Sequence, residues 1–311
     1  MNLSSMQSHR DTLIYAAYYA PRGGPRLYML AGELSQRYLL PSDLLVGVIG
    51  AEGSGKSTLI KGLFPGLELT NDDDGVNVKS APIYAFTADD FFSGHTFHID
   101  ARYELAFRQK FEVVDSIKNA IAHGRRVIVE HFDIIYHALG YNAQIIFGIG
   151  EEIIVSRPSV FGPRPDSIKA VVDKTIKYRR MAHSAEDITW MILAKDYHFT
   201  PPIYHSDVKH GFVISFEEKP AIDLDELESK VKAVIAADVP IGPGGEHRIG
   251  VGDDFIECTG PRTHVKSSGQ IENFRLIKEY KHNFITNEFM LVGVVGRKET
   301  AGYEDINEAG L

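Results

Sequence analysis

Short apolar runs recur along the first half of the chain, each followed by glycine, proline or charged residues. Residues 44–50 read LLVGVIG, and comparable runs occur at three other places. Runs of this length, bounded by turn-forming residues, are typical of buried strands. The four predicted strands lie at residues 44–50, 82–86, 125–132 and 143–149.

Between these runs, apolar residues recur with the spacing of a helix. Three helices are predicted, over residues 27–40, 57–64 and 101–123. The first two stop at Pro41 and Pro65, because proline cannot continue a helix. Strands that alternate with helices indicate a parallel sheet with helical crossovers. The first half therefore predicts an α/β fold of the doubly wound kind.

The pattern changes after a segment rich in proline and glycine, Ser156–Pro165. Beyond it we expect a long helix over about residues 166–194, a strand at 211–216, a helix at 223–237 and further short strands, an α+β arrangement. The same segment would also serve as a lid over a site in the first half. The predicted domains are an N-terminal helical extension (residues 1–40), the α/β domain (41–165), the α+β domain (166–300) and a tail (301–311).

The composition is that of a globular protein with a large core, with 44% hydrophobic and 24% charged residues. A single cysteine, Cys258, excludes an intramolecular disulfide and suits a reducing compartment, so we expect a cytoplasmic protein. The apolar runs are short and interrupted by charge, so no membrane partner is predicted.

The net charge bears on possible nucleic-acid partners. At −9 it argues against a surface that is basic throughout. One local strip, Lys169–Arg180, gathers five lysines and arginines on a predicted helix. It is either a solvated helix face or a docking surface for tRNA.

The segment GAEGSGKST follows the first predicted strand and opens a helix. Its glycines, lysine and serine have the spacing of a Walker A phosphate-binding loop, in which successive backbone N–H groups turn inward around phosphates. We expect Lys56 to lie against the β- and γ-phosphates and Ser57 to ligate Mg²⁺. A degenerate loop that no longer binds nucleotide is the alternative. The residues predicted to bind ATP are Gly50, Gly53, Ser54, Gly55, Lys56, Ser57 and Thr58.

Acidic residues follow other apolar runs, and they would determine which reaction the bound nucleotide undergoes. The segment AFTADDFF carries Asp89 and Asp90 and resembles a segment of uridine-kinase-like P-loop kinases. That resemblance implies that one of the two acts as a general base toward an acceptor hydroxyl. The segment VIVEHFD resembles a Walker B strand, which implies that Glu130 or Asp133 holds Mg²⁺ directly or through water.

Further charged residues are open to two interpretations. The acidic cluster Thr70–Gly75 is either a metal site or a solvated turn. Arg157 and Arg164 are either lid residues that neutralise transferred phosphate or parts of a linker.

Three segments of the second half resemble one family in the same order along the chain. They are RRMAHSAEDITWMI (residues 179–192), GFVISFEEKPAIDLDELESKVKAVIAADVPI (211–241) and GDDFIECTGPRTHVKSSGQIENFRLI (252–277). They resemble the second additional domain of alanyl- and threonyl-tRNA synthetases. The resemblance implies a pocket that hydrolyses mischarged aminoacyl-tRNA, often with Zn²⁺. The order of the two halves resembles that of bacterial P-loop proteins that carry this domain.

Carried onto this chain, the resemblance implies a ligand set of His183, Asp187, Cys258 and His264. Asp187 replaces a histidine of the family, although its i, i+4 spacing keeps it beside His183 and a carboxylate can ligate zinc. Two extra residues separate the cysteine from the histidine that follows it. Three interpretations stay open: a Zn²⁺ site, a metal-free substrate-sensing pocket, and a structural remnant. His205 and His210 are further possible ligands.

Two functions follow from these motifs. The first is a kinase-like phosphotransferase or NTPase that uses ATP and Mg²⁺ and passes phosphate to a small-molecule acceptor or to water. The second is an aminoacyl-tRNA deacylase, or an amino-acid or tRNA sensor, with the nucleotide loop as a switch. A nucleotide-regulated binding protein without turnover is a third possibility.

Overall fold

The computed structural model describes residues 14–69, 81–87, 95–158, 160–200, 204–245 and 247–296. The described chain divides into two compact units. The first contains the described residues up to Tyr18 and from Arg26 to Lys174, and the second contains Tyr19–Pro25 and the described residues from Thr175 onward. The division therefore falls within a helix rather than at residue 165, and a short N-terminal segment belongs to the second unit.

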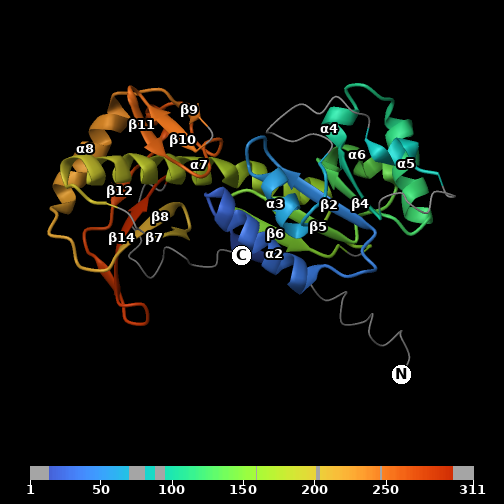
Figure 1. Cartoon of the computed structure of the whole chain (residues 1–311), viewed down its shortest axis with the longest axis horizontal. Coiled ribbons are helices and arrows are strands. Elements are labelled where there is room, and N and C mark those ends of the chain that lie inside the picture. Colours follow the sequence, from blue (N-terminus) through green and yellow to red (C-terminus); the bar gives the residue numbers. More distant parts are fainter. Residues whose placement is uncertain are drawn as a thin grey trace. The chain divides into compact units, whose positions relative to one another are not determined.

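A six-stranded mixed sheet forms the centre of the first unit (Figure 1). Three of its pairings, β2 with β4, β2 with β5 and β3 with β4, are parallel, whereas β5 and β6 are antiparallel. This confirms an α/β fold. The strand order is β1-β6-β5-β2-β4-β3, with bounds β1 Ala16–Tyr19, β2 Leu45–Gly50, β3 Thr96–Asp100, β4 Arg126–Glu130, β5 Ile145–Ile149 and β6 Glu152–Ser156.

The central strands are buried along their whole length, which is why they read as continuous apolar runs rather than alternating ones. The helices of this part of the chain are α2 Gly24–Tyr38, α3 Lys56–Leu63, α4 Ala101–Glu104, α5 Lys110–Ala122, α6 Phe132–Leu139 and the 32-residue α7 Pro165–Asp196. No helix in the described residues is long and apolar enough to cross a membrane.

Two predictions for this unit were wrong in detail. Residues 82–86 are not a strand, because Pro82 opens a 3₁₀ turn, η1 Pro82–Ala85, and the strand of this region is β3. The helix predicted over residues 101–123 is two helices. It restarts at Lys110 because Gln109 and Glu112 form a reciprocal capping box, with Gln109 N donating to Glu112 at 2.9 Å.

In the described residues of the second unit, antiparallel sheets pack with α8 (Leu224–Ala236) and the C-terminal part of α7 (Figure 1). The C-terminal part of α7 supplies Ala185 and Ile188 to its core, where they join Phe212 and Leu227. The remaining elements are β7 Tyr204–Val208, β8 Gly211–Phe216, α8 Leu224–Ala236, β9 Ile241–Gly245, β10 Arg248–Val251, β11 Asp254–Glu257, η2 Ser268–Gln270, β12 Arg275–Leu276, β13 Lys281–Asn283 and β14 Glu288–Val294.

Candidate functional site

The glycine-rich segment of the first unit forms a turn between a buried strand and a helix. Strand β2 ends at Gly50, and α3 begins at Lys56. Gly55 has φ of 92°, a left-handed conformation that residues with a Cβ rarely adopt. A Cβ on Gly55 would also lie 2.6 Å from Leu27 Cδ2. The predicted strand–loop–helix context is therefore present.

Lys56 is buried at the start of α3 and bonds to the loop itself. Its Nζ donates to the carbonyl oxygen of Ala51 at 2.8 Å and lies 3.5 Å from Oε1 of Glu130. Glu130 ends β4, which pairs directly with β2, and so the sheet brings the two side chains together. Burial acts to raise the pKa of Glu130, but His98 and Lys56 outweigh burial and hold it below its ordinary value. The carboxylate is therefore charged beside the lysine.

Two residues that the sequence analysis missed lie with Glu130. Asp100, Glu130 and His131 are all buried, and each offers a ligand atom within 4.8 Å of the others, a set that could hold a metal ion. Asp100 ends β3 and is in register with Glu130. The prediction of a strand over residues 82–86 instead of 96–100 left Asp100 unrecognised. The useful signal was the short apolar run that ends in an aspartate, TFHID.

Asp133, the other predicted Mg²⁺ ligand, has a different partner. Its Oδ2 lies 3.7 Å from Nζ of Lys169, and burial raises its pKa. The structure therefore groups Glu130 with Asp100 and His131, and Asp133 with Lys169. Ser57 is buried in the first turn of α3, directly after Lys56.

Several predicted residues lie outside the described part of the chain or away from the loop. Asp89, Asp90, residues 70–75 and the tail 301–311 are outside the described residues. Arg157 pairs with Asp43 through two bonds of 2.8 and 2.7 Å. Asp43 precedes β2, whereas the glycine-rich loop follows it, so Arg157 lies at the opposite end of the strand from Lys56 and is not a lid residue there. Arg164 is exposed just before α7.

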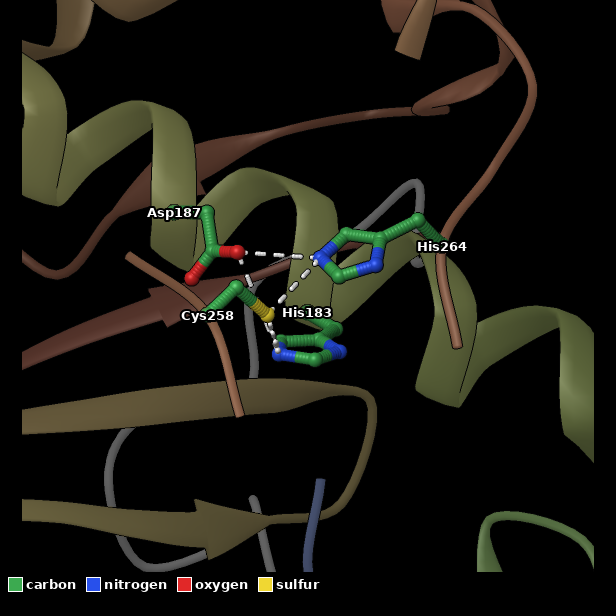
Figure 2. Close-up of side chains that lie close together, drawn as sticks. All are labelled: His183, Asp187, Cys258 and His264. Carbon is green, nitrogen blue, oxygen red and sulfur yellow. Dashed lines mark hydrogen bonds and ion pairs between the residues drawn. The ribbon is translucent and has the colours of Figure 1, made fainter. Parts of the chain in front are cut away.

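In the second unit, the four residues implied by the synthetase resemblance lie together (Figure 2). His183 and Asp187 project from successive turns of α7, Cys258 directly follows β11, and His264 lies in the loop beyond it. Cys258 Sγ lies 3.5 Å from His183 Nε2 and 3.9 Å from His264 Nε2. Asp187 Oδ2 lies 2.9 Å from His264 Nε2 and 3.9 Å from His183 Nε2.

The orientation of both imidazoles follows from their outer nitrogens. His183 Nδ1 lies 3.1 Å from the carbonyl oxygen of Thr263, and His264 Nδ1 lies 3.3 Å from that of Pro261. Carbonyl oxygens only accept, so Nδ1 donates in each ring, and Nε2 of a neutral ring carries a lone pair. Both lone pairs then face the centre of the cluster. Backbone bonds of this kind orient histidine ligands in metal sites.

The spacing of the four donors fits a tetrahedral metal ion. Donors at the bond lengths of tetrahedral Zn²⁺ lie about 3.3–3.6 Å from one another. Four of the donor pairs in the cluster lie 2.9–3.9 Å apart. Two nitrogens, one sulfur and one carboxylate oxygen are ligands that Zn²⁺ accepts. The residues present therefore fit such an ion.

The pKa shifts describe the protonation of the cluster without a metal ion. Burial, His264 and Arg22 lower the pKa of His183 well below its ordinary value, so the ring stays neutral. Burial and the neighbouring Asp187 raise the pKa of the Cys258 thiol, so without a cation the sulfur keeps its proton. A divalent cation reverses this preference because it stabilises the thiolate.

The other predicted basic and histidine residues do not join a site. Arg179 is buried and donates to the carbonyl oxygen of Pro21, and Lys169 pairs with Asp173 at 2.9 Å. The Lys169–Arg180 strip is therefore not one continuous solvated face. His205 bonds to Glu186, and His210 packs edge-on against Tyr178.

Comparison of the chain with models of known protein families finds no match, and a comparison with curated proteins finds no significant relative. The function is therefore argued from the two sites themselves.

Proposed function

We propose that the first unit binds a nucleoside triphosphate with Mg²⁺ at residues 50–58 and transfers its terminal phosphoryl group to a small-molecule acceptor or to water. The observation that carries this proposal is the buried contact of Lys56 with Glu130 beside a glycine-rich turn. An ammonium group held there by a loop carbonyl and a carboxylate can exchange these partners for phosphate oxygens.

Each residue of the loop has a role in this proposal. Backbone N–H groups around Gly53 and Gly55, together with the N-terminus of α3, would hold the phosphates. Lys56 would neutralise charge that develops on the transferred group. Ser57 and Glu130 would hold Mg²⁺, whose chemistry is to bridge and neutralise phosphate oxygens.

The acceptor side of the proposed site is defined by strand ends. Asp100 and His131 share the buried cluster with Glu130, and both follow strands of the parallel part of the sheet. Ligands of open α/β sheets bind beyond the carboxyl ends of such strands. Asp100 is therefore a second candidate, beside Asp89 and Asp90, for the base that orients the nucleophile.

Nucleotide binding tests this proposal directly. Titration calorimetry with a non-hydrolysable ATP analogue and Mg²⁺ should give saturable binding to the wild type and none to Lys56→Ala. Lys61→Ala changes a lysine of the same helix that is not in the loop, and it should bind like the wild type. Equal affinity in Lys56→Ala and the wild type would overturn the proposal.

A second candidate function rests on the four donors of the second unit. We infer that His183, Asp187, Cys258 and His264 hold a Zn²⁺ ion. Four protein ligands are typical of a closed, structural zinc site, whereas a catalytic one keeps a position for water. An aminoacyl-tRNA hydrolase would therefore need one ligand to give way.

Metal analysis and deacylation separate the alternatives within this second candidate. About one zinc per chain with no deacylation of charged alanine or threonine tRNA supports a structural or sensing centre. Zinc with deacylation that is lost on Cys258→Ser supports the hydrolase. Purified protein that neither retains zinc nor binds added Zn²⁺ would overturn the metal centre.

A further inference from the structure

The segment Tyr19–Pro25, here called the strap, runs from the last residue of β1 into the first two residues of α2, and it packs as part of the second unit. Its sequence is YAPRGGP. Residues 20–23 form no regular element, so the backbone of this part of the strap depends on partners in the second unit for its position. Those partners lie beside the four-donor cluster.

Arg22 anchors the strap in the second unit. Its guanidinium is 5% exposed and donates twice to Glu186, at 2.8 and 3.2 Å. It also lies 2.8 Å from Asp207 Oδ1 and donates to the carbonyl oxygens of Gly211 and Ser206. A buried guanidinium with two carboxylate partners and two carbonyl partners is a fixed geometric element. Glu186 directly precedes Asp187 on α7, so the anchor acts on the helix that carries two donors.

The strap backbone also supports the loop that carries the other two donors. Gly24 N donates to the carbonyl oxygen of Thr259 at 3.0 Å, one residue beyond Cys258. A Cβ on Gly260 would lie 2.3 Å from the carbonyl oxygen of Arg22 and 3.1 Å from His183 Cε1. Gly260 is therefore held between the strap and a donor ring. The strap contacts both elements that supply ligands, α7 and the loop after β11.

We propose that Arg22 is a positioning residue for the four-donor cluster, and that the strap completes a Zn²⁺ site which the rest of the second unit cannot form alone. This inference rests on the second candidate function. Arg22 holds Glu186, and through it the turn of α7 with Asp187, while the strap backbone fixes the register of the Cys258 loop. Loss of an outer partner of this kind typically lowers metal affinity 10- to 100-fold.

The test compares Zn²⁺ affinity in full-length variants by competition with a chromophoric chelator. Arg22→Met should lower the affinity at least about 10-fold. Arg22→Lys keeps the charge but not the two-pronged bond to Glu186, and it should fall between Arg22→Met and the wild type. Arg157→Met removes an arginine–carboxylate pair of the first unit, in which only the carboxylate is fully buried, and should leave Zn²⁺ affinity unchanged. Wild-type affinity in Arg22→Met would overturn the inference.

A second measurement keeps the inference testable without metal. Amide hydrogen exchange of residues 258–265 in metal-free protein should be faster in Arg22→Met than in the wild type or Arg157→Met. If the wild type binds no Zn²⁺ but this difference is present, the metal centre fails and the positioning role stands. If exchange of these residues is the same in all three proteins, the positioning role fails. If Arg22→Met does not fold, Arg22→Lys takes its place in the comparison. Its Zn²⁺ affinity and its hydrogen exchange at residues 258–265 then decide the inference in the same way.

Discussion

Nε2 of His264 lies 2.9 Å from Oδ2 of Asp187, although 77 residues separate them in the chain. Since Nδ1 of His264 faces a carbonyl oxygen, a neutral ring would present its lone pair to the carboxylate. The contact is favourable only with a cation between the two atoms or a second proton on the ring. The contact is therefore one of the observations that support the proposed Zn²⁺ site.

Asp187→Asn should therefore weaken Zn²⁺ binding. The amide oxygen keeps the shape of the side chain but loses the negative charge, so we expect at least about a 10-fold loss of affinity. Chelator competition measures this. Asp173→Asn removes a carboxylate from an exposed position of the same helix and should have no effect. Equal affinities in the two variants would show that Asp187 is not a ligand.

Gly55→Ala should abolish nucleotide binding and destabilise the first unit. An alanine at φ of 92° costs about 1–2 kcal/mol in the backbone, and its Cβ would meet Leu27 at 2.6 Å. Gly66→Ala is the matched control, because Gly66 has φ of 86° and no atom within 4 Å of an added Cβ. Thermal unfolding should show a larger loss for Gly55→Ala, and nucleotide titration should show a loss only there.

The stability of the first unit should depend on pH through His131. Burial and nearby Lys56 lower the pKa of this ring to about 4, from an ordinary value of 6.5. Between these two values the unfolded chain gains a proton at His131 that the folded protein does not, so stability is complete above pH 6.5 and falls as the pH is lowered toward 4.

His131→Asn removes this titration and suits the left-handed backbone at that position. The loss of unfolding free energy over the same pH range should be smaller than in the wild type, by up to about 1.4 kcal/mol per pH unit. Urea unfolding at several pH values measures it. His137→Asn changes an exposed histidine of the same helix and should leave the slope as it is. An unchanged slope in His131→Asn would contradict the assignment.

Asp43→Asn should destabilise the first unit without changing nucleotide affinity. It leaves the partly buried guanidinium of Arg157 with a neutral partner in place of a buried carboxylate. Breaking a fully buried pair costs about 3–5 kcal/mol, so we expect a smaller loss of unfolding free energy than that. Denaturant unfolding and nucleotide titration of the same variant measure the two quantities. A large change in affinity with unchanged stability would restore the lid interpretation of Arg157.

Local pattern was sufficient for several elements of this protein. The strand at residues 45–50, the glycine turn and the helix from Lys56 follow from a buried apolar run, positive-φ glycines and a helix start, all of which are encoded within a few residues. The i, i+4 spacing likewise predicted that His183 and Asp187 share a helix face. The strand predicted at residues 82–86 was wrong because Pro82 opens a turn. Asp100 was therefore not recognised as the end of a strand, and it was absent from the predicted site.

The tertiary structure alone decided which distant residues meet. The order of strands in the sheet brings Glu130 to Lys56, and Asp43 draws Arg157 to the other end of the sheet. The strap places Arg22 beside Glu186, 164 residues away. A buried charge is stable only beside an opposite charge or a hydrogen-bond partner, and that partner can lie far away in the sequence. The periodicity of apolar residues along the chain does not encode which residues pair in this way. The sequence by itself therefore determined the elements and the candidate donors, and packing determined the partners of each donor.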